Sequence, residues 1–409
     1  MTSEQWIEDI KTSIRRRRLD ALKRTSFDVP KVETRNWPWQ APSYYRWMAT
    51  WSEDAKVQIA SAIAKGAAGR YREIVEWDVT LYAWMESAAM YLRDWPTTLL
   101  ATQASRANRE EEAVRLLRWT DEEIQNIAGT WGPHMHYVTI CDLMQDSPVS
   151  DPTLDGPYCG AFFCTDPENP FVGLVFKGTH PESWQELLVD LHYPPVRAEN
   201  GHVWGTQVSH GVYSTLFEPF AVLSGQSPFE YIKYTVCTMI AERIHAVTNS
   251  TVRLHITGHS LGASYAALSY AELLRLYNNA PIAPLSSGPP TCVLRDLYSF
   301  GCPRFGLADF ADVFTLAMDE HEGSCWRILA RDDPVGLVPP VLITDAKFIH
   351  LDRAYEVSDS ESPTELPSER NSHPRPPLPV VSINMSNHTP WAYFNALHHA
   401  ATQLSPKVR

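Results

Sequence analysis

The stretch TVRLHITGHSLG, residues 251–262, decides the fold that this sequence predicts. Apolar and polar residues alternate in its first half, with Val252, Leu254 and Ile256 on one face, which is typical of a short β-strand. The strand pattern runs directly into Gly-His-Ser-Leu-Gly at 258–262, and an alanine-rich helical pattern follows at once. A serine flanked by glycines between a strand and a helix is the context that a nucleophile elbow requires.

The geometry of such a turn makes Ser260 the candidate nucleophile. The turn strains the backbone of the serine and raises its hydroxyl above the sheet edge, while the flanking glycines let strand and helix pass without a Cβ clash. The backbone N–H of Leu261 begins the helix, so it can point at an oxyanion with the helix dipole behind it. The bare pattern also occurs by chance, but its position between a strand and a helix favours the functional interpretation.

The composition of the chain narrows the class of protein. With 409 residues, 44% of them hydrophobic, the chain can bury the core of one large domain or two ordinary ones. A net charge of −13 argues against a nucleic-acid partner. No apolar run reaches membrane-spanning length and the N-terminal segment has no apolar core after its charges, so we expect no secretory signal and a cytoplasmic protein.

Cysteine and histidine usage points away from disulfides and metal. Seven cysteines, scattered and odd in number, fit free thiols in a reducing compartment. Neither a C-x-x-C pair nor an H-E-x-x-H run is present, so the sequence gives no support for a zinc site. We expect neither a metal nor an organic cofactor.

The chain changes character near residue 135. Residues 1–134 carry helical patterns alone, including a long one over 70–95 that Pro96 is expected to end. In residues 135–409 strand patterns alternate with helical ones, which predicts an α/β fold with a mostly parallel central sheet covered by helices. Residues 358–379 are rich in Ser, Glu and Pro and are expected to form an exposed loop.

The residue pattern of the N-terminal extension does not decide what this extension does. Its first helical pattern is amphipathic, with an apolar face followed by four arginines at 15–18, and a basic amphipathic helix can lie on an anionic membrane or pack on the rest of the protein. The aromatic-rich segment 36–51 also has two interpretations. It can contact a lipid or a partner protein, or it can pack in the core. The apolar face consists of Trp6, Ile7, Ile10 and Ile14.

A serine nucleophile needs a base, and the base needs a carboxylate that fixes its tautomer. Where the serine sits on an elbow of this kind, the acid and then the histidine follow it along the chain. A strand pattern at 326–330 is followed by Asp332 and Asp333, and the carboxyl end of a strand is where an active site of this architecture lies. Both aspartates are candidates, although either can simply cap a turn before Pro334.

Five histidines follow the acid: His350, His373, His388, His398 and His399. His373 lies in the Pro/Ser-rich segment, and the last two lie inside a helical pattern. His388 sits in a turn that opens the last helix, so it can reach back over the sheet. Its rival His350 lies in a strand-like run at 348–351, and we favour His388.

The second oxyanion donor should come from the loop after an earlier strand. The run LVFK at 174–177 predicts such a strand, and Gly178 and Thr179 follow it. Thr179 can offer both its N–H and its hydroxyl to an oxyanion. Taken alone, Gly178-Thr179 is equally well an ordinary turn.

Six segments, in this order, resemble the fungal-type triacylglycerol lipases, or class three lipases, of the α/β-hydrolase fold. They are VFKGTH (175–180), VSHGVY (208–213), GHSLG (258–262), SFGCPRFG (299–306), DPVGLVPP (333–340) and NHTPWAYF (387–394). The resemblance covers about residues 135–405 and implies Thr179 at the oxyanion position, Asp333 rather than Asp332 as the acid, and His388 as the base. The helices of 1–134 lie outside the family pattern.

The resemblance implies a serine hydrolase that cleaves carboxylic esters of lipids or other apolar acyl substrates through an acyl-enzyme. It also implies a lid after the oxyanion loop, for which the apolar face of the helical pattern at 183–193 is the candidate; a plain amphipathic helix on the sheet is the alternative. That face consists of Trp184, Leu187, Leu188 and Leu191.

Three further expectations stay open at this point. The same acyl-enzyme can serve an acyltransferase or a special-purpose esterase, because the acceptor is a property of the pocket. A lipase-like interaction protein is the alternative from another class, and the presence of all three triad residue types favours an enzyme over it. The N-terminal helices can cover an acyl pocket, form a homo-oligomer or make a peripheral membrane contact.

Overall fold

A computed structural model describes residues 3–25, 42–143, 155–178, 194–277, 291–339, 346–369 and 385–404. Its centre is an eight-stranded sheet in the order β1-β2-β3-β6-β7-β8-β9-β10. The strands are β1 (Met135–Asp142), β2 (Tyr158–Cys164), β3 (Phe171–Lys177), β6 (Val252–His259), β7 (Cys292–Phe300), β8 (Cys325–Ala330), β9 (Ala354–Val357) and β10 (Thr364–Leu366). A separate small sheet pairs β4 (Pro195–Arg197) with β5 (Gln207–Ser209).

The middle of the large sheet is parallel and its edges are antiparallel. Strands β3, β6, β7, β8 and β9 run parallel to one another. Strands β1 and β2 on one side and β10 on the other join in antiparallel pairs. All residues of β2 and β3 are buried, as expected of apolar runs covered on both faces. The predicted α/β fold with a mostly parallel sheet is confirmed.

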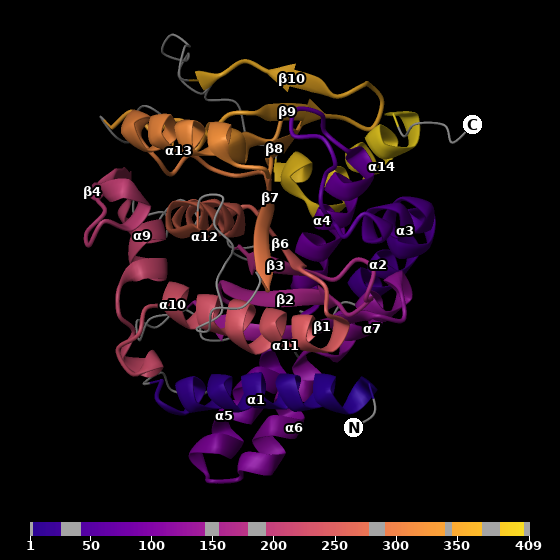
Figure 1. Cartoon of the computed structure of the whole chain (residues 1–409), viewed down its shortest axis with the longest axis vertical. Coiled ribbons are helices and arrows are strands. Elements are labelled where there is room, and N and C mark those ends of the chain that lie inside the picture. The colour runs from indigo at the N-terminus through magenta and orange to yellow at the C-terminus, as the bar shows by residue number, and fades with distance from the viewer. Residues whose placement is uncertain are drawn as a thin grey trace.

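Helices cover both faces of the sheet (Figure 1). One layer contains α9 (His210–Phe217), α10 (Pro228–Lys233), the π-helical stretch η4 (Tyr234–Ala241), α11 (Glu242–Thr248), α12 (Leu261–Tyr277) and α13 (Ala308–Glu320). The opposite layer contains α2 (Pro42–Asp54), α3 (Lys56–Ala64), α4 (Trp77–Ala89), α7 (Glu122–Trp131) and α14 (Pro390–Leu404). Short 3-10 turns include η1 (Met90–Leu92), η2 (His202–Gly205), η3 (Ala221–Leu223), η5 (Pro334–Leu337) and η7 (Met385–His388).

The N-terminal helices share the core of the sheet. All 13 residues of α4 are buried, and the helix packs on the sheet beside α14. Helix α1 (Ser3–Lys23) lies near the β1 edge with α5 (Trp95–Arg106) and α6 (Glu110–Thr120) (Figure 1). Its predicted apolar face is buried in the main core, and Arg18 reaches Asp142 with an N–O distance of 2.7 Å. The two alternatives for this face were contact with a membrane and packing on the rest of the protein. In the structure the face packs on the rest of the protein.

Two expected segments differ from the structure. The helix predicted over 70–95 is wrong in its limits, since α4 begins only at Trp77 and Pro96 lies in the first turn of α5. Asp94 caps that helix by accepting the N–H of Thr97 at 3.1 Å, so the proline starts a helix here instead of ending one. In the segment predicted as an exposed loop, 364–366 form β10 and Glu369 is paired with Arg304 at 2.9 Å.

No helix in the described parts of the chain is long and apolar enough to span a membrane.

Buried polar pairs hold α4 against β6. Glu86 Oε2 lies 2.6 Å from His255 Nε2, and both side chains are at most 1% exposed. One residue further along the helix, the hydroxyls of Ser87 and Thr257 are 2.9 Å apart. Each pair satisfies groups that would otherwise be desolvated without a partner.

We expect Glu86→Ala to lower the free energy of unfolding by about 1 to 3 kcal/mol, because it leaves the imidazole of His255 buried without its hydrogen-bond partner. Urea titration measures this, with Glu53→Ala as the control because the ion pair of Glu53 with Lys56 is exposed. Equal small losses in both variants would show that the buried pair does not stabilise the fold.

Candidate active site

The elbow stands between β6 and α12. Ser260 has a φ of +61° and is buried, and its N–H donates to Phe300 O at 2.9 Å. A Cβ at Gly258 would lie 2.5 Å from Gly262 O, and one at Gly262 would lie 2.3 Å from Phe176 O. Only glycine at these two positions lets β6, α12 and β3 approach so closely. The strained serine is the kind of backbone outlier that functional sites keep.

The end of β3 closes on the first N–H of α12. A Cβ at Gly178 would lie 3.0 Å from Leu261 N and 2.8 Å from His259 O, so this contact leaves no room for a side chain. Thr179 lies outside the described residues, and its oxyanion role stays a prediction. The predicted lid also lies outside them, with Trp184, Leu187, Leu188 and Leu191.

A buried acid and histidine face each other across the end of β8. Asp333 Oδ2 lies 2.7 Å from His388 Nδ1, and both side chains are fully buried. Asp333 Oδ1 accepts the N–H of Val335 at 2.9 Å, and Tyr393 Oη donates to Oδ2. Burial and the Asp333 carboxylate raise the pKa of Tyr393 well above its usual value, so this phenol keeps the proton it donates. The carboxylate of Asp333 therefore has three polar partners, from His388, Val335 and Tyr393.

This contact fixes the tautomer of the histidine. A carboxylate only accepts, so Nδ1 of His388 carries the proton and Nε2 keeps the lone pair that a general base needs. His388 sits in η7, directly before α14, so the helix that follows holds its backbone.

The rival residues lie elsewhere. Asp332 is exposed in a turn with φ +60°. His350 is buried and donates from Nε2 to Gly336 O at 2.7 Å; burial lowers its pKa well below the usual value. The strand predicted around it is wrong, because only Ile349 forms an isolated bridge, to Gly306.

Of the remaining candidate histidines, the two that the structure describes take no part in this arrangement. His398 lies in α14, stacks on Phe394 and places Nε2 3.2 Å from Asp54 O on α2. His399 is half-buried in the same helix, and His373 lies outside the described residues.

Gly301 lies between the elbow and the pair of Asp333 and His388. It follows Phe300, the acceptor of the Ser260 N–H, and has a φ of +55°. A Cβ there would lie 2.7 Å from His388 Cε1 and 2.9 Å from Asp333 Oδ2. Next to Ser260, the ring of His259 stacks on that of His388 with 4.4 Å between centroids. At the carboxyl ends of β6, β7 and β8 the structure thus brings Asp333 and His388 into contact and places Ser260 in the neighbouring elbow, where its Oγ makes no hydrogen bond with a described residue.

We expect Gly301→Ala to lower kcat by about a hundredfold, since the new methyl group displaces the acid and histidine and small misplacements of reacting groups cost this much. Ester hydrolysis measures the loss. Gly201→Ala is the matched control, because Gly201 also has positive φ, +74°, and nothing lies within 4 Å of its added Cβ. Similar losses of kcat in the two variants would contradict the role of the close approach.

The sequence interpretation missed two aromatic residues that contact this region. Trp84 of α4 stacks on Tyr393 with 4.9 Å between centroids and meets His259 edge-on at 5.2 Å. Tyr91 of η1 places Oη 2.7 Å from His259 Nδ1. The available signal was the absence of a polar face on α4, which is typical of a helix buried all round.

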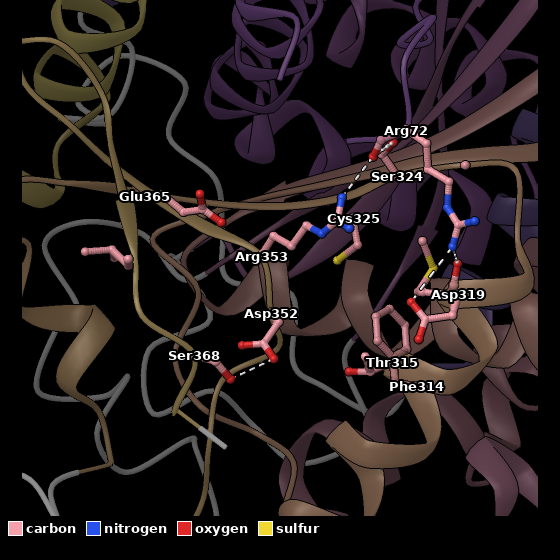
Figure 2. A pocket seen from close by; sticks show the side chains of 13 residues that line it. Arg72, Phe314, Thr315, Asp319, Ser324, Cys325, Asp352, Arg353, Glu365 and Ser368 are labelled. Atoms are coloured by element: carbon pink, nitrogen blue, oxygen red, sulfur yellow. Dashed lines mark hydrogen bonds and ion pairs between the residues drawn. The ribbon is translucent and has the colours of Figure 1, made fainter. Parts of the chain in front are cut away.

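A separate polar pocket of about 310 Å³ lies beside α13, β8 and β10 (Figure 2). Its two arginines already have backbone partners, since Arg353 Nη1 donates to Arg72 O at 3.2 Å and Arg72 donates to Met318 O. Asp319, Asp352 and Glu365 also line it, so both signs of charge are present. Among the described residues no group of three or more His, Cys, Asp or Glu is arranged to hold a metal ion.

The sheet, the elbow and the buried acid–histidine pair define an α/β-hydrolase. The family model described as "Lipase (class 3)" matches residues 173–343, which run from within β3 past the acid at Asp333. Over these residues the chain is similar to the class 3 lipases.

The chain also resembles individual proteins in part. It is 33% identical over 94 residues to "Secreted mono- and diacylglycerol lipase 1" of Fusarium solani, a match that spans 23% of this chain and 22% of that relative. Lipase II from Rhizopus niveus is 18% identical, with 68% of this chain and 80% of that chain covered and a TM-score of 0.39. A Rhizomucor miehei lipase propeptide complex is 22% identical, with 49% and 53% covered and a TM-score of 0.34.

Proposed function

We propose that the protein is a serine hydrolase that cleaves carboxylic esters of lipids or other apolar acyl substrates. The observation that carries the proposal is the fully buried pair of Asp333 and His388 beside a strained Ser260. The class 3 lipase match supports a lipid ester as the substrate. The relative in Fusarium is named for mono- and diacylglycerols, which favours glycerol esters as the natural substrates.

The chemistry follows from these positions. Ser260 Oγ attacks the acyl carbonyl while His388 Nε2 takes its proton, and the tetrahedral oxyanion forms next to the Leu261 N–H, with Thr179 as the proposed second donor. His388 then gives the proton to the leaving alcohol, which leaves the acyl group on Ser260. A water molecule attacks this ester with His388 again as base, and the carboxylic acid departs. Asp333 keeps the imidazole oriented and stabilises its cation throughout.

The test uses p-nitrophenyl esters from acetyl to palmitoyl, together with a fluorophosphonate probe. Turnover that rises with chain length and a probe adduct mapped to the peptide containing Ser260 would support a lipase. A maximum at short chains would favour an esterase or a biosynthetic enzyme with a special acyl group. Absence of both turnover and adduct would overturn the proposal in favour of an interaction protein.

Acyl transfer is the second candidate, since the same acyl-enzyme can react with an alcohol or amine in place of water. Mass analysis of products formed with glycerol or an amine as co-substrate separates the two reactions. Free acid as the sole product would exclude transfer to those acceptors.

A cytoplasmic location remains part of the proposal. All seven cysteines are buried free thiols, which suits a reducing compartment. The relative in Fusarium is named as secreted, so the two proteins need not share a location. Measuring the native protein in culture medium and in cell extract decides between them.

Peripheral membrane contact also remains a proposal. It is supported by Trp47 of α2 and Trp391 of α14, which are both 45% exposed and whose rings lie 5.7 Å apart. Trp391 follows His388 by three residues, so the pair lies close to the candidate site. Indole rings favour the interface between lipid and water. Sedimentation with phosphatidylcholine vesicles tests this; equal binding by wild type and Trp47→Ala/Trp391→Ala would contradict it.

A homo-oligomer formed through the N-terminal helices also remains a proposal. Size-exclusion chromatography of the same preparation tests it.

A further inference from the structure

Tyr91 contacts the residue that precedes the candidate nucleophile. Its Oη lies 2.7 Å from His259 Nδ1, and the two ring centroids are 5.8 Å apart. Burial and the Asp155 carboxylate raise the pKa of Tyr91, so the phenol stays protonated and donates to Nδ1. The proton of a neutral His259 is therefore on Nε2.

His259 is itself held in a neutral state between aromatic rings. Burial and then the neighbouring His388 lower the pKa of His259 well below its usual value. Trp84 meets the ring edge-on at an interplanar angle of 89°, and His388 stacks on it with an interplanar angle of 27°. The orientation of the His259 ring is thus fixed by the Tyr91 hydroxyl, by Trp84 and by His388.

We propose that Tyr91 is a positioning residue for the general base, acting through His259. This inference rests on the proposed function, in which His388 accepts the proton of Ser260. His388 becomes a cation at that moment, and a neutral aromatic ring on its face attracts the cation. A charged His259 would repel the His388 cation, because like charges in contact disfavour each other. A rotated His259 ring would displace the ring of His388. The hydroxyl of Tyr91 holds His259 in the orientation and tautomer that suit this task.

Helix α4 places Tyr91 by its contacts along β6. Successive residues of a strand alternate between faces, so His255, Thr257 and His259 share one face of β6. Glu86 pairs with the first, Ser87 with the second and Tyr91 with the third. The N-terminal part of the chain therefore supplies residues that surround the general base on one side. This role differs from covering an acyl pocket, forming a homo-oligomer or contacting a membrane.

The test compares Tyr91→Phe with Tyr44→Phe. Both changes delete one phenol oxygen, but that of Tyr91 reaches His259, whereas that of Tyr44 donates to Ala88 O at 2.9 Å. We expect Tyr91→Phe to lower kcat and the rate of Ser260 labelling by a fluorophosphonate about tenfold, the scale of one lost hydrogen bond, with KM unchanged. Tyr44→Phe should keep both rates.

A double-mutant cycle gives the second measurement. His259→Phe keeps a ring against His388 but cannot accept the Tyr91 hydroxyl, so adding Tyr91→Phe to it should cause no further loss of kcat. Additive losses would overturn the action through His259. If Tyr91→Phe keeps the kcat of the wild type, or changes only KM, Tyr91 is not a positioning residue. The proposed function is unaffected by that result as long as the probe labels Ser260 in the wild type. Failure of the wild type itself to label would instead count against the proposed function.

Discussion

Replacing Ser260 with alanine is expected to lower kcat for ester hydrolysis by roughly a millionfold. The change removes the atom that forms the acyl-enzyme, and loss of the nucleophile of a triad costs about this much while the oxyanion donors and binding still give some catalysis over water. The backbone of residue 260 keeps its bond to Phe300 O, so the fold around the elbow should persist.

Ser264→Ala is the matched control for this experiment. Ser264 is also buried, lies one turn further along α12, and contacts Cys302 Sγ at 3.7 Å without reaching the acid or the histidine. Initial rates with a p-nitrophenyl ester and active-site titration with a fluorophosphonate compare the two. Substantial turnover by Ser260→Ala, or equal losses in both variants, would contradict the assignment of the nucleophile.

The second large effect is expected at the acid. Asp333→Asn should lower kcat by roughly 10⁴-fold, because an amide can hold the imidazole in the wrong tautomer and carries no charge to stabilise its cation. The size of the side chain is kept and Tyr393 can still donate to the remaining oxygen, so the loss should appear in kcat rather than in stability.

Asp332→Asn serves as the control because it makes the same chemical change one residue away on an exposed side chain. Its kcat should stay within about twofold of wild type, as surface changes away from a site usually have small effects. Steady-state kinetics at pH 8 and thermal unfolding of both variants complete the comparison. A large loss in Asp332→Asn with little change in Asp333→Asn would move the acid to the other aspartate.

The elbow was predictable because its parts are neighbours in the chain. The alternation of residues 252–257, the glycines on both sides of Ser260 and the alanines that follow each have a local physical meaning. The structure has β6 and α12 on either side of Ser260 as that pattern predicts. The parallel sheet followed from the same kind of local evidence, since strand and helix patterns alternate along residues 135–409.

The acid and the histidine were less well determined by local evidence. Residue patterns make Asp332 and Asp333 equal candidates, and within the sequence only the family resemblance favours Asp333. The structure distinguishes them by burial: Asp333 turns inward to three donors, while Asp332, with positive φ, faces solvent. No sequence period encodes which of two adjacent aspartates points into the protein, because the turn between strand and helix decides it.

The sequence by itself determined the class of fold, the elbow and the set of residue types from which a triad can be built, because each depends on spacing within a few residues. Only the tertiary structure decided which of them meet: Asp333 and His388 are 55 residues apart and Tyr91 and His259 are 168 apart. Such contacts form when α4 and α14 pack on one face of the sheet, and packing depends on the shapes of whole layers. For this reason the N-terminal helices gave no chemical signal as a sequence and yet contact the candidate site in the folded protein.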